Sequence, residues 1–222
     1  MSVQVTARNG APDSENRIHS DEVARQYGFP AALVPGITVY GYIVSPDFLE
    51  RGTLHVRFLK PVIDGDQLLI RTDSHTVTAE RQGEMCAVAT LGGDPLVFPE
   101  IAERLLPDER PHASAEWISP GTILGTVKQP LAPSGASDNI PASLLELANR
   151  ILMQNYRLGP WMHVSSDVAT FSRAQWGDHM EARGMIRDRF EKKGREFVIV
   201  DVEVGSGDRL IQRIRHTAIY RM

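Results

Sequence analysis

The hydrophobic pattern of the first half predicts a short strand, two helices and then several more strands. Val3 to Ala7 alternate between apolar and polar positions, as in a half-exposed strand. A short helix is predicted from Ser20 to Gly28. The apolar run 36–44 also fits a buried strand by periodicity, but Pro35-Gly36 favours the start of a helix. Because this run contains Gly41, we expect a sheet to pack closely against it. Alternating patterns predict further strands at 54–58, 67–78 and 84–91.

The second half repeats this order. Residues 123–127 favour a strand, residues 134–139 a polar loop, and Pro141 suits the first turn of a helix with one apolar face. Turns at 193–194 and 206–208 separate later segments of strand pattern. These strands are predicted at 162–171, 179–190, 195–204 and 210–220. The chain therefore contains a strand, a helix and several further strands in the same order twice, which indicates a duplicated unit.

This repeated order predicts how the apolar helices are buried. A helix followed by an antiparallel meander is covered most simply when the sheet wraps around it. Two such units joined edge to edge would form one continuous sheet with two central helices, which is the double hot-dog architecture of the α+β class. We predict an N-terminal unit at 1–92, a linker at 93–120 and a C-terminal unit at 121–222, with a short helix at 101–106 inside the linker.

Composition narrows the possible partners. The 222 residues carry a net charge of −4 with no cluster of basic residues, which argues against nucleic acid and anionic membranes as partners. We see neither a signal peptide nor an apolar stretch of about 20 residues, and therefore expect a cytoplasmic protein. Cys86, the only cysteine, cannot form an intrachain disulfide and is expected to be buried and inert. The seven histidines show no metal-ligand spacing, so we expect no metal.

The stretch 16–36 contains the most distinctive polar residues. It reads Asn16-Arg17-Ile18-His19-Ser20-Asp21, continues through Gly28-Phe29, and ends at Pro35-Gly36. The first N–H groups of a helix are unpaired and lie at the positive end of its dipole. A loop histidine and such a helix start could therefore face the same ligand.

These residues resemble the motif of the MaoC-like acyl dehydratase/hydratase family. Its pattern is Asp-x-Asn-Pro-x-His-x-Asp, then a short helix with Gly-Phe, then His-Gly at the start of the central helix. Residues 56–66 are similar to the strand that follows, and residues 161–220 to the later strands of a second unit. The resemblance implies an enoyl-thioester hydratase or 3-hydroxyacyl-thioester dehydratase. CoA or an acyl carrier would then be part of the substrate, with no separate cofactor.

The resemblance also implies roles for individual residues. By position, His19 is the catalytic base, Asn16 assists it, and the Gly36 N–H stabilises the enolate-like oxygen. The family aspartate falls at Ser14, so Asp13, one residue away, is the candidate replacement.

The remaining candidates concern substrate binding and rival functions. Ser14 and Tyr40 are candidates for contact with the substrate. Glu146 on the second central helix could instead activate water in a hot-dog acyl-thioesterase, as could Asp13. A third hypothesis, based on the missing aspartate, is a catalytically degenerate acyl-CoA-binding subunit. In each case we expect a small-molecule acyl thioester as ligand and a homodimer as the assembly.

Overall fold

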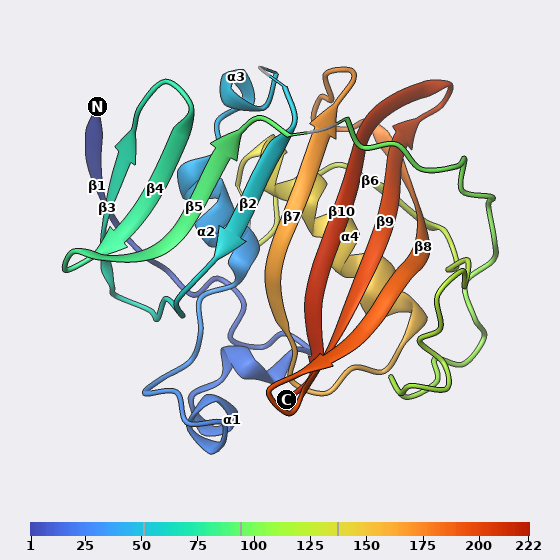
Figure 1. Ribbon diagram of the computed structural model, residues 1–222, viewed down its shortest axis with the longest axis horizontal. Coiled ribbons are helices and arrows are strands. Elements are labelled where there is room, and N and C mark those ends of the chain that lie inside the picture. Colours follow the sequence, from blue (N-terminus) through green and yellow to red (C-terminus); the bar gives the residue numbers. More distant parts are fainter. Residues whose placement is uncertain (51, 94, 137) are drawn as a thin grey trace.

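A single antiparallel sheet dominates the computed structural model, which describes residues 1–50, 52–93, 95–136 and 138–222. Asp94 of the predicted linker and Ser137 of the predicted polar loop lie outside these ranges. Within the described residues, the sheet has ten strands in the order β1-β3-β4-β5-β2-β7-β10-β9-β8-β6 (Figure 1). The chain is therefore α+β, and its sheet stays open with β1 and β6 at its two edges.

The first half contributes the strands on one side of this sheet. They are β1 (Ser2–Thr6), β2 (Leu54–Phe58), β3 (Gln67–Thr72), β4 (Thr76–Arg81) and β5 (Glu84–Leu91). Its helices are η1 (Arg17–His19), α1 (Asp21–Gln26), α2 (Gly36–Ile43) and α3 (Pro46–Leu49). The apolar run after Pro35-Gly36 is thus a helix, as predicted, and the predicted strands 54–58 and 84–91 are present. The strand predicted at 67–78 is instead two strands, because a turn at 73–75 separates β3 from β4.

The second half contributes the other strands and one long helix. These elements are β6 (Val127–Pro130), α4 (Ile140–Asn155), β7 (Met162–Thr170), β8 (His179–Lys192), β9 (Arg195–Ser206) and β10 (Arg209–Arg221). Its strand order, β6-β8-β9-β10-β7, corresponds strand for strand to β1-β3-β4-β5-β2 of the first half. Antiparallel pairing of β2 with β7 joins the halves, from Leu54 opposite Val168 to Arg57 opposite Ser165. The predicted duplication is therefore present in the topology, whereas the exact unit boundaries remain a prediction.

Both central helices lie on the same face of the sheet, and the sheet curls around them (Figure 1). On α4, Leu145, Ile151 and Leu152 are fully buried, and each buried side chain of this size stabilises the fold by about 1.5–3 kcal/mol. Gly184 of β8 permits the close approach of α4, because a Cβ atom there would lie 2.6 Å from Ile151 Cγ2.

The close approach at Gly41 differs from the prediction. The sheet does cover α2, but the group against Gly41 is the start of α4. Asn139 Nδ2 donates a hydrogen bond to the Gly41 carbonyl at 3.1 Å, and a Cβ atom on Gly41 would lie 2.8 Å from that nitrogen. Gly41 therefore sets the spacing between the two central helices.

The predicted helix at 101–106 is wrong, because this segment has no helical structure. Ile101 is buried with Phe98 and Ala169 in a small apolar cluster on the sheet face opposite the helices. Its N–H donates to Glu203 Oε2 at 3.1 Å, and the Arg213 guanidinium lies 5.0 Å from the centre of the Phe98 ring. An extended chain can place these groups on the sheet, and this contact outweighs the weak local preference for helix.

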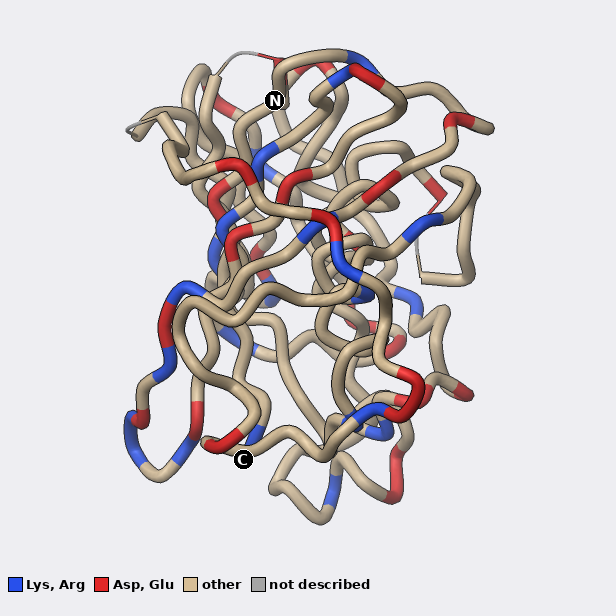
Figure 2. Tube along the Cα trace, turned by 90° about the vertical axis from the view of Figure 1, so that its right-hand side faces the viewer, with Lys and Arg blue, Asp and Glu red and all other residues tan. Residues whose placement is uncertain are grey.

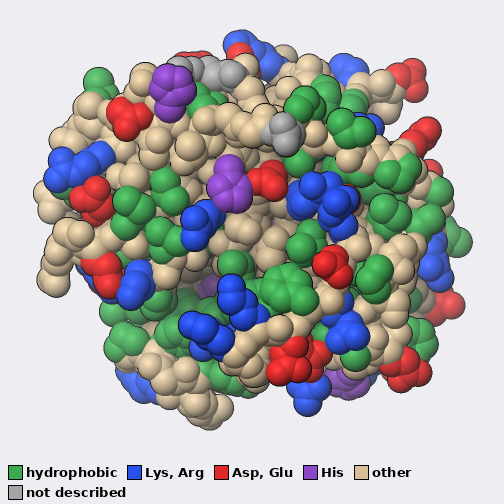
Figure 3. All heavy atoms as spheres, viewed as in Figure 1, with side chains coloured by type: hydrophobic (Ala, Val, Ile, Leu, Met, Phe, Trp, Pro, Cys, Tyr) green, Lys and Arg blue, Asp and Glu red, His purple; other side chains and the backbone are tan. Residues whose placement is uncertain are grey.

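The charged side chains are dispersed over the surface. Acidic and basic residues are interspersed along the chain trace (Figure 2) and over the outer face of the sheet (Figure 3). Among the described residues, no helix is both long and apolar enough to cross a bilayer.

Candidate functional site

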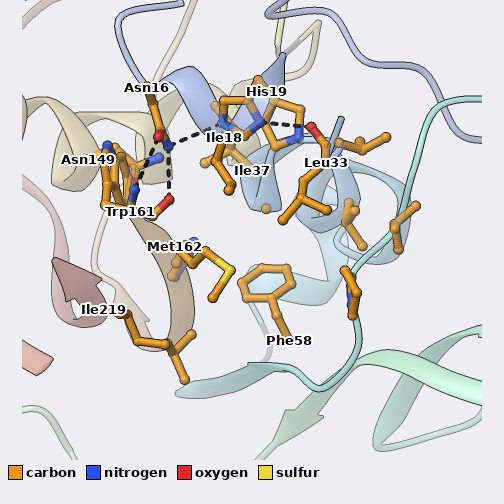
Figure 4. Close-up of a pocket in the computed structure, with 18 of the residues that line it drawn as sticks. Asn16, Ile18, His19, Leu33, Ile37, Phe58, Asn149, Trp161, Met162 and Ile219 are labelled. Carbon is orange, nitrogen blue, oxygen red and sulfur yellow. Dashed lines mark hydrogen bonds between the residues drawn. The ribbon is translucent and has the colours of Figure 1, made fainter. Parts of the chain in front are cut away.

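A cavity of about 380 Å³ opens where the two halves of the chain meet. Its wall includes the polar loop 11–19, the start of α2, the chain after β2, one face of α4 and the start of β7. Most of the lining is apolar (Figure 4). Polar groups from both halves are therefore presented within an otherwise apolar space, which is typical of small-molecule sites.

Asn16 connects the polar loop to the second half of the chain by hydrogen bonds. It is only 5% exposed. Its Nδ2 donates to the Trp161 carbonyl at 3.0 Å, and its Oδ1 accepts from the Trp161 N–H at 3.2 Å (Figure 4). Because both ends of the amide are engaged, the orientation of the Asn16 side chain is defined.

His19 is held in one tautomer by its backbone partner. Its Nδ1 lies 2.7 Å from the Leu33 carbonyl oxygen (Figure 4). A carbonyl can only accept, so Nδ1 carries the hydrogen and Nε2 carries a lone pair. Asn16 Nδ2 contacts this lone pair at the longer distance of 3.3 Å. Burial lowers the pKa of His19, although the hydrogen bond to Leu33 opposes that shift. The imidazole is therefore a neutral base at neutral pH.

The start of α2 supplies unpaired donors to the same cavity. Gly36 and Ile37 both line it. Pro35 occupies the N-cap and provides no side-chain cap. The first intrahelical bonds to Pro35 O come from Thr38 and Val39, so neither the Gly36 N–H nor the Ile37 N–H finds an acceptor in the described part of the chain. Such N–H groups at a helix start can stabilise a negatively charged oxygen.

The structure separates the predicted site residues into two groups. Asn16, His19, Gly36 and Ser14 all line the cavity. Ser14 Oγ accepts from the Asn16 N–H at 3.0 Å, so it also shapes the loop. Asp13, in contrast, is exposed and lies outside the cavity wall.

Tyr40 is not part of the wall either. It is fully buried in the main core, and burial raises the pKa of its hydroxyl. Tyr40 shares the helix face of Gly36 and Ile37 but lies one turn further along α2. At that depth its side chain packs into the core instead of lining the cavity.

The carboxylate that does line the cavity is Glu146 of α4. It accepts a hydrogen bond from Ser134 Oγ at 2.9 Å and pairs with Arg150 at 2.9 Å. Asn149, about one helical turn further, also lines the cavity, and its buried Oδ1 has no partner among the described residues. The α4 face therefore contributes polar groups to the same cavity as the His19 loop.

Sequence reasoning missed His163 and Asn149 as cavity residues. His163 lies at the start of β7, and its ring centre is 4.2 Å from that of His216 on β10. No local pattern marks this pair, because only the register that places Ser166 opposite His216 brings the rings together. No group of three or more potential metal-binding side chains occurs among the residues described.

The duplicated strand order with a helix in each half defines the double hot-dog fold. Among solved structures, a conserved hypothetical protein from Mycobacterium tuberculosis, described as having this fold, aligns with a TM-score of 0.60 and 14% identity over 99% of this chain and 95% of its own. A MaoC domain protein dehydratase from Chloroflexus aurantiacus J-10-fl, so described, aligns with a TM-score of 0.58 and 14% identity over 100% and 95%. A structure described as an oleoyl thioesterase from Lactobacillus plantarum aligns with a TM-score of 0.53 and 10% identity over 100% of this chain and 96% of its own.

At these identities the similarity establishes the fold alone. The MaoC-like resemblance of the sequence thus agrees with its structural neighbours, which include MaoC-like dehydratases and acyl-CoA thioesterases. No protein-family model matches the sequence, and no curated protein matches it significantly. The choice between the two chemistries therefore depends on the residues in the cavity.

Proposed function

We propose that this protein is a hydro-lyase that adds water to enoyl thioesters, or removes it from 3-hydroxyacyl thioesters, with CoA or an acyl carrier as part of the substrate. One observation carries the proposal. The His19 imidazole is fixed with its hydrogen on Nδ1, so that Nε2 is the basic atom, in the same cavity as the unpaired N–H groups of Gly36 and Ile37. A base and an oxyanion donor are the two elements that this reaction requires.

The proposed hydration is a balanced addition of one water molecule. His19 Nε2 takes a proton from water while the water oxygen bonds to carbon 3 of the enoyl group. The electrons of the double bond move toward the thioester, and the resulting negative oxygen accepts hydrogen bonds from the Gly36 N–H. The proton held by His19 then passes to carbon 2. Water takes the place of the 3.3 Å contact from Asn16 Nδ2 to His19 Nε2. The Leu33 carbonyl holds the imidazole in place meanwhile.

The apolar wall suits the acyl part of such a substrate. Ile18, Ile37, Phe58, Met162 and Ile219 surround the space beside the polar groups (Figure 4). Their burial of an acyl chain would contribute about 25 cal/mol per Å² of apolar surface removed from water. The apolar wall also excludes water from the developing charge, which strengthens the helix-start hydrogen bonds.

The pH dependence of hydration tests the assignment of His19. Because burial lowers the pKa of His19, its neutral form persists below the ordinary histidine pKa of about 6.5. We expect kcat/KM for crotonyl-CoA hydration to stay constant as the pH falls to 6.5, and then to decline with a midpoint below that value. A midpoint above 6.5 would exclude the buried, neutral His19 as the base.

A thioesterase is the second candidate, because Glu146 lines the cavity and could activate water for attack on the thioester carbon. Under our proposal Glu146 has no such role. We expect that butyryl-CoA releases no free CoA above the background rate and that Glu146→Gln changes nothing in this assay. Glu22→Gln, on the exposed surface of α1, is the matched control. If the wild type releases CoA and Glu146→Gln abolishes this release, the protein is a thioesterase instead.

A further inference from the structure

Three polar side chains form a buried chain beneath the start of α2. His163 Nε2 lies 2.9 Å from Ser166 Oγ, and the same oxygen lies 3.2 Å from His216 Nδ1. Ser166 and His216 are 1% and 0% exposed. The outer ring atoms, His163 Nδ1 and His216 Nε2, are buried without a partner among the described residues. An unpartnered buried polar atom costs about 1–3 kcal/mol, so this arrangement calls for an explanation.

The His163 end of this chain adjoins the proposed oxyanion site. A Cβ atom added to Gly36 would lie 3.3 Å from His163 Cβ and 3.4 Å from His163 Nδ1. Both residues line the cavity. The Phe58 ring packs against the other side of the imidazole, with ring centres 4.6 Å apart. His163 Nδ1 is therefore held beside the helix start that carries the unpaired Gly36 N–H, and a larger residue at position 36 would crowd it.

Both histidines are neutral in the folded protein. Burial lowers the pKa of His163 well below its usual value and the nearby His216 lowers it further, although a hydrogen bond with the Ser165 backbone opposes this shift. Burial also lowers the pKa of His216 to about 3. Two neutral imidazoles and one hydroxyl carry three hydrogens, of which the two contacts to Ser166 Oγ use two.

If the Ser166 hydroxyl donates in one of the two contacts, the third hydrogen has two possible positions. It lies either on His216 Nε2, where it has no acceptor, or on His163 Nδ1, beside the helix start. A buried N–H without an acceptor is rarer in proteins than an unsatisfied acceptor. An oxygen bound at the helix start would therefore select the second arrangement. His216 Nδ1–H then donates to Ser166 Oγ, and Ser166 O–H donates to His163 Nε2, which leaves His163 Nδ1–H to donate to the ligand.

We propose that His163 is a further catalytic residue, whose Nδ1–H joins the Gly36 N–H as a second donor to the thioester oxygen, with Ser166 and His216 as positioning residues that fix its tautomer. This role rests on the proposed acyl-thioester function. A neutral imidazole is a suitable donor here, because it stabilises the developing negative charge by a hydrogen bond without burying a positive charge.

The tautomer of His163 can be measured directly. Protein labelled with ¹⁵N in its histidine rings would be titrated with butyryl-CoA, a saturated thioester that cannot be hydrated. We expect the ring nitrogen shifts of bound protein to show the His163 hydrogen on Nδ1. A complex in which butyryl-CoA alters the His19 signals but leaves the His163 hydrogen on Nε2 overturns the donor role alone. If butyryl-CoA does not bind at all, the proposed function fails and the donor role fails with it.

Kinetics of crotonyl-CoA hydration supply an independent test. Loss of one oxyanion donor lowers kcat by about 10²–10³-fold. We therefore expect His163→Leu to lower kcat by a factor in this range, with little change in KM. His163→Gln, which keeps an N–H donor, should recover part of the loss, and Ser166→Ala should lower kcat about tenfold. Ser165→Ala, the neighbour on β7, is the control and should match the wild type. Equal activity of His163→Leu and the wild type overturns the proposal.

Discussion

Replacing His19 with alanine should lower kcat for crotonyl-CoA hydration by about 10²–10⁴-fold, the usual contribution of a positioned general base. The reason is geometric. The Leu33 carbonyl fixes the hydrogen on Nδ1, so Nε2 is the basic atom in the cavity. His163, by contrast, has its Nε2 engaged with Ser166. The measurement is the initial rate of hydration at saturating substrate.

The control for this experiment separates chemistry from folding. His179→Ala removes an exposed histidine at the start of β8 and should leave the rate unchanged. His19→Ala also removes the hydrogen bond to Leu33, which stabilises the fold by about 1 kcal/mol, so the melting temperature should be recorded for both variants. A folded His19→Ala protein that hydrates crotonyl-CoA at the wild-type rate contradicts the assignment.

Acid should destabilise the protein before its carboxylates are protonated, because His216 is buried in neutral form. Its pKa is about 3 in the folded state and about 6.5 in the unfolded chain. Between these values the unfolded state binds more protons, so the free energy of unfolding falls by about 1.4 kcal/mol per pH unit as the pH is lowered below 6.5. At pH 5 this single group should account for a loss of roughly 2 kcal/mol. The pKa of His163 is also lowered by burial, so this group too reduces the free energy of unfolding as the pH falls.

Urea unfolding at pH 7 and pH 5 measures this loss. His216→Gln removes the titrating group, so the difference in unfolding free energy between the two pH values should shrink by roughly 2 kcal/mol relative to the wild type. His179→Gln, on the exposed surface, should retain the full difference. An identical pH dependence in all three proteins would show that burial of His216 does not govern acid stability.

Much of the fold follows from local sequence patterns. The alternating segments became strands because one face of the sheet is buried against α2 and α4, and the repeated order of elements predicted the duplicated topology. The segment 101–106 was mispredicted because its structure is set by contacts such as Ile101 with the sheet, which lies far away in sequence.

The site was predictable only where its residues are close in sequence. Asn16, His19 and Gly36 share one stretch of chain, and the structure brings all three to the cavity. Asp13 is exposed and outside the cavity wall, since its position depends on the loop conformation rather than on spacing. The carboxylate in the wall is Glu146, whose helix face could not be assigned to the cavity before the packing of α4 was known. The contact of His163 with His216 depends on strand register in the same way.

The most direct test of this account is the product that the wild-type protein forms from crotonyl-CoA. Mass spectrometry of the reaction mixture distinguishes the possible outcomes. We predict a thioester that has gained one water molecule and still carries CoA, with no free CoA above the background. Release of free CoA and crotonate would contradict the hydro-lyase assignment in favour of a thioesterase, and an unchanged substrate would contradict both activities.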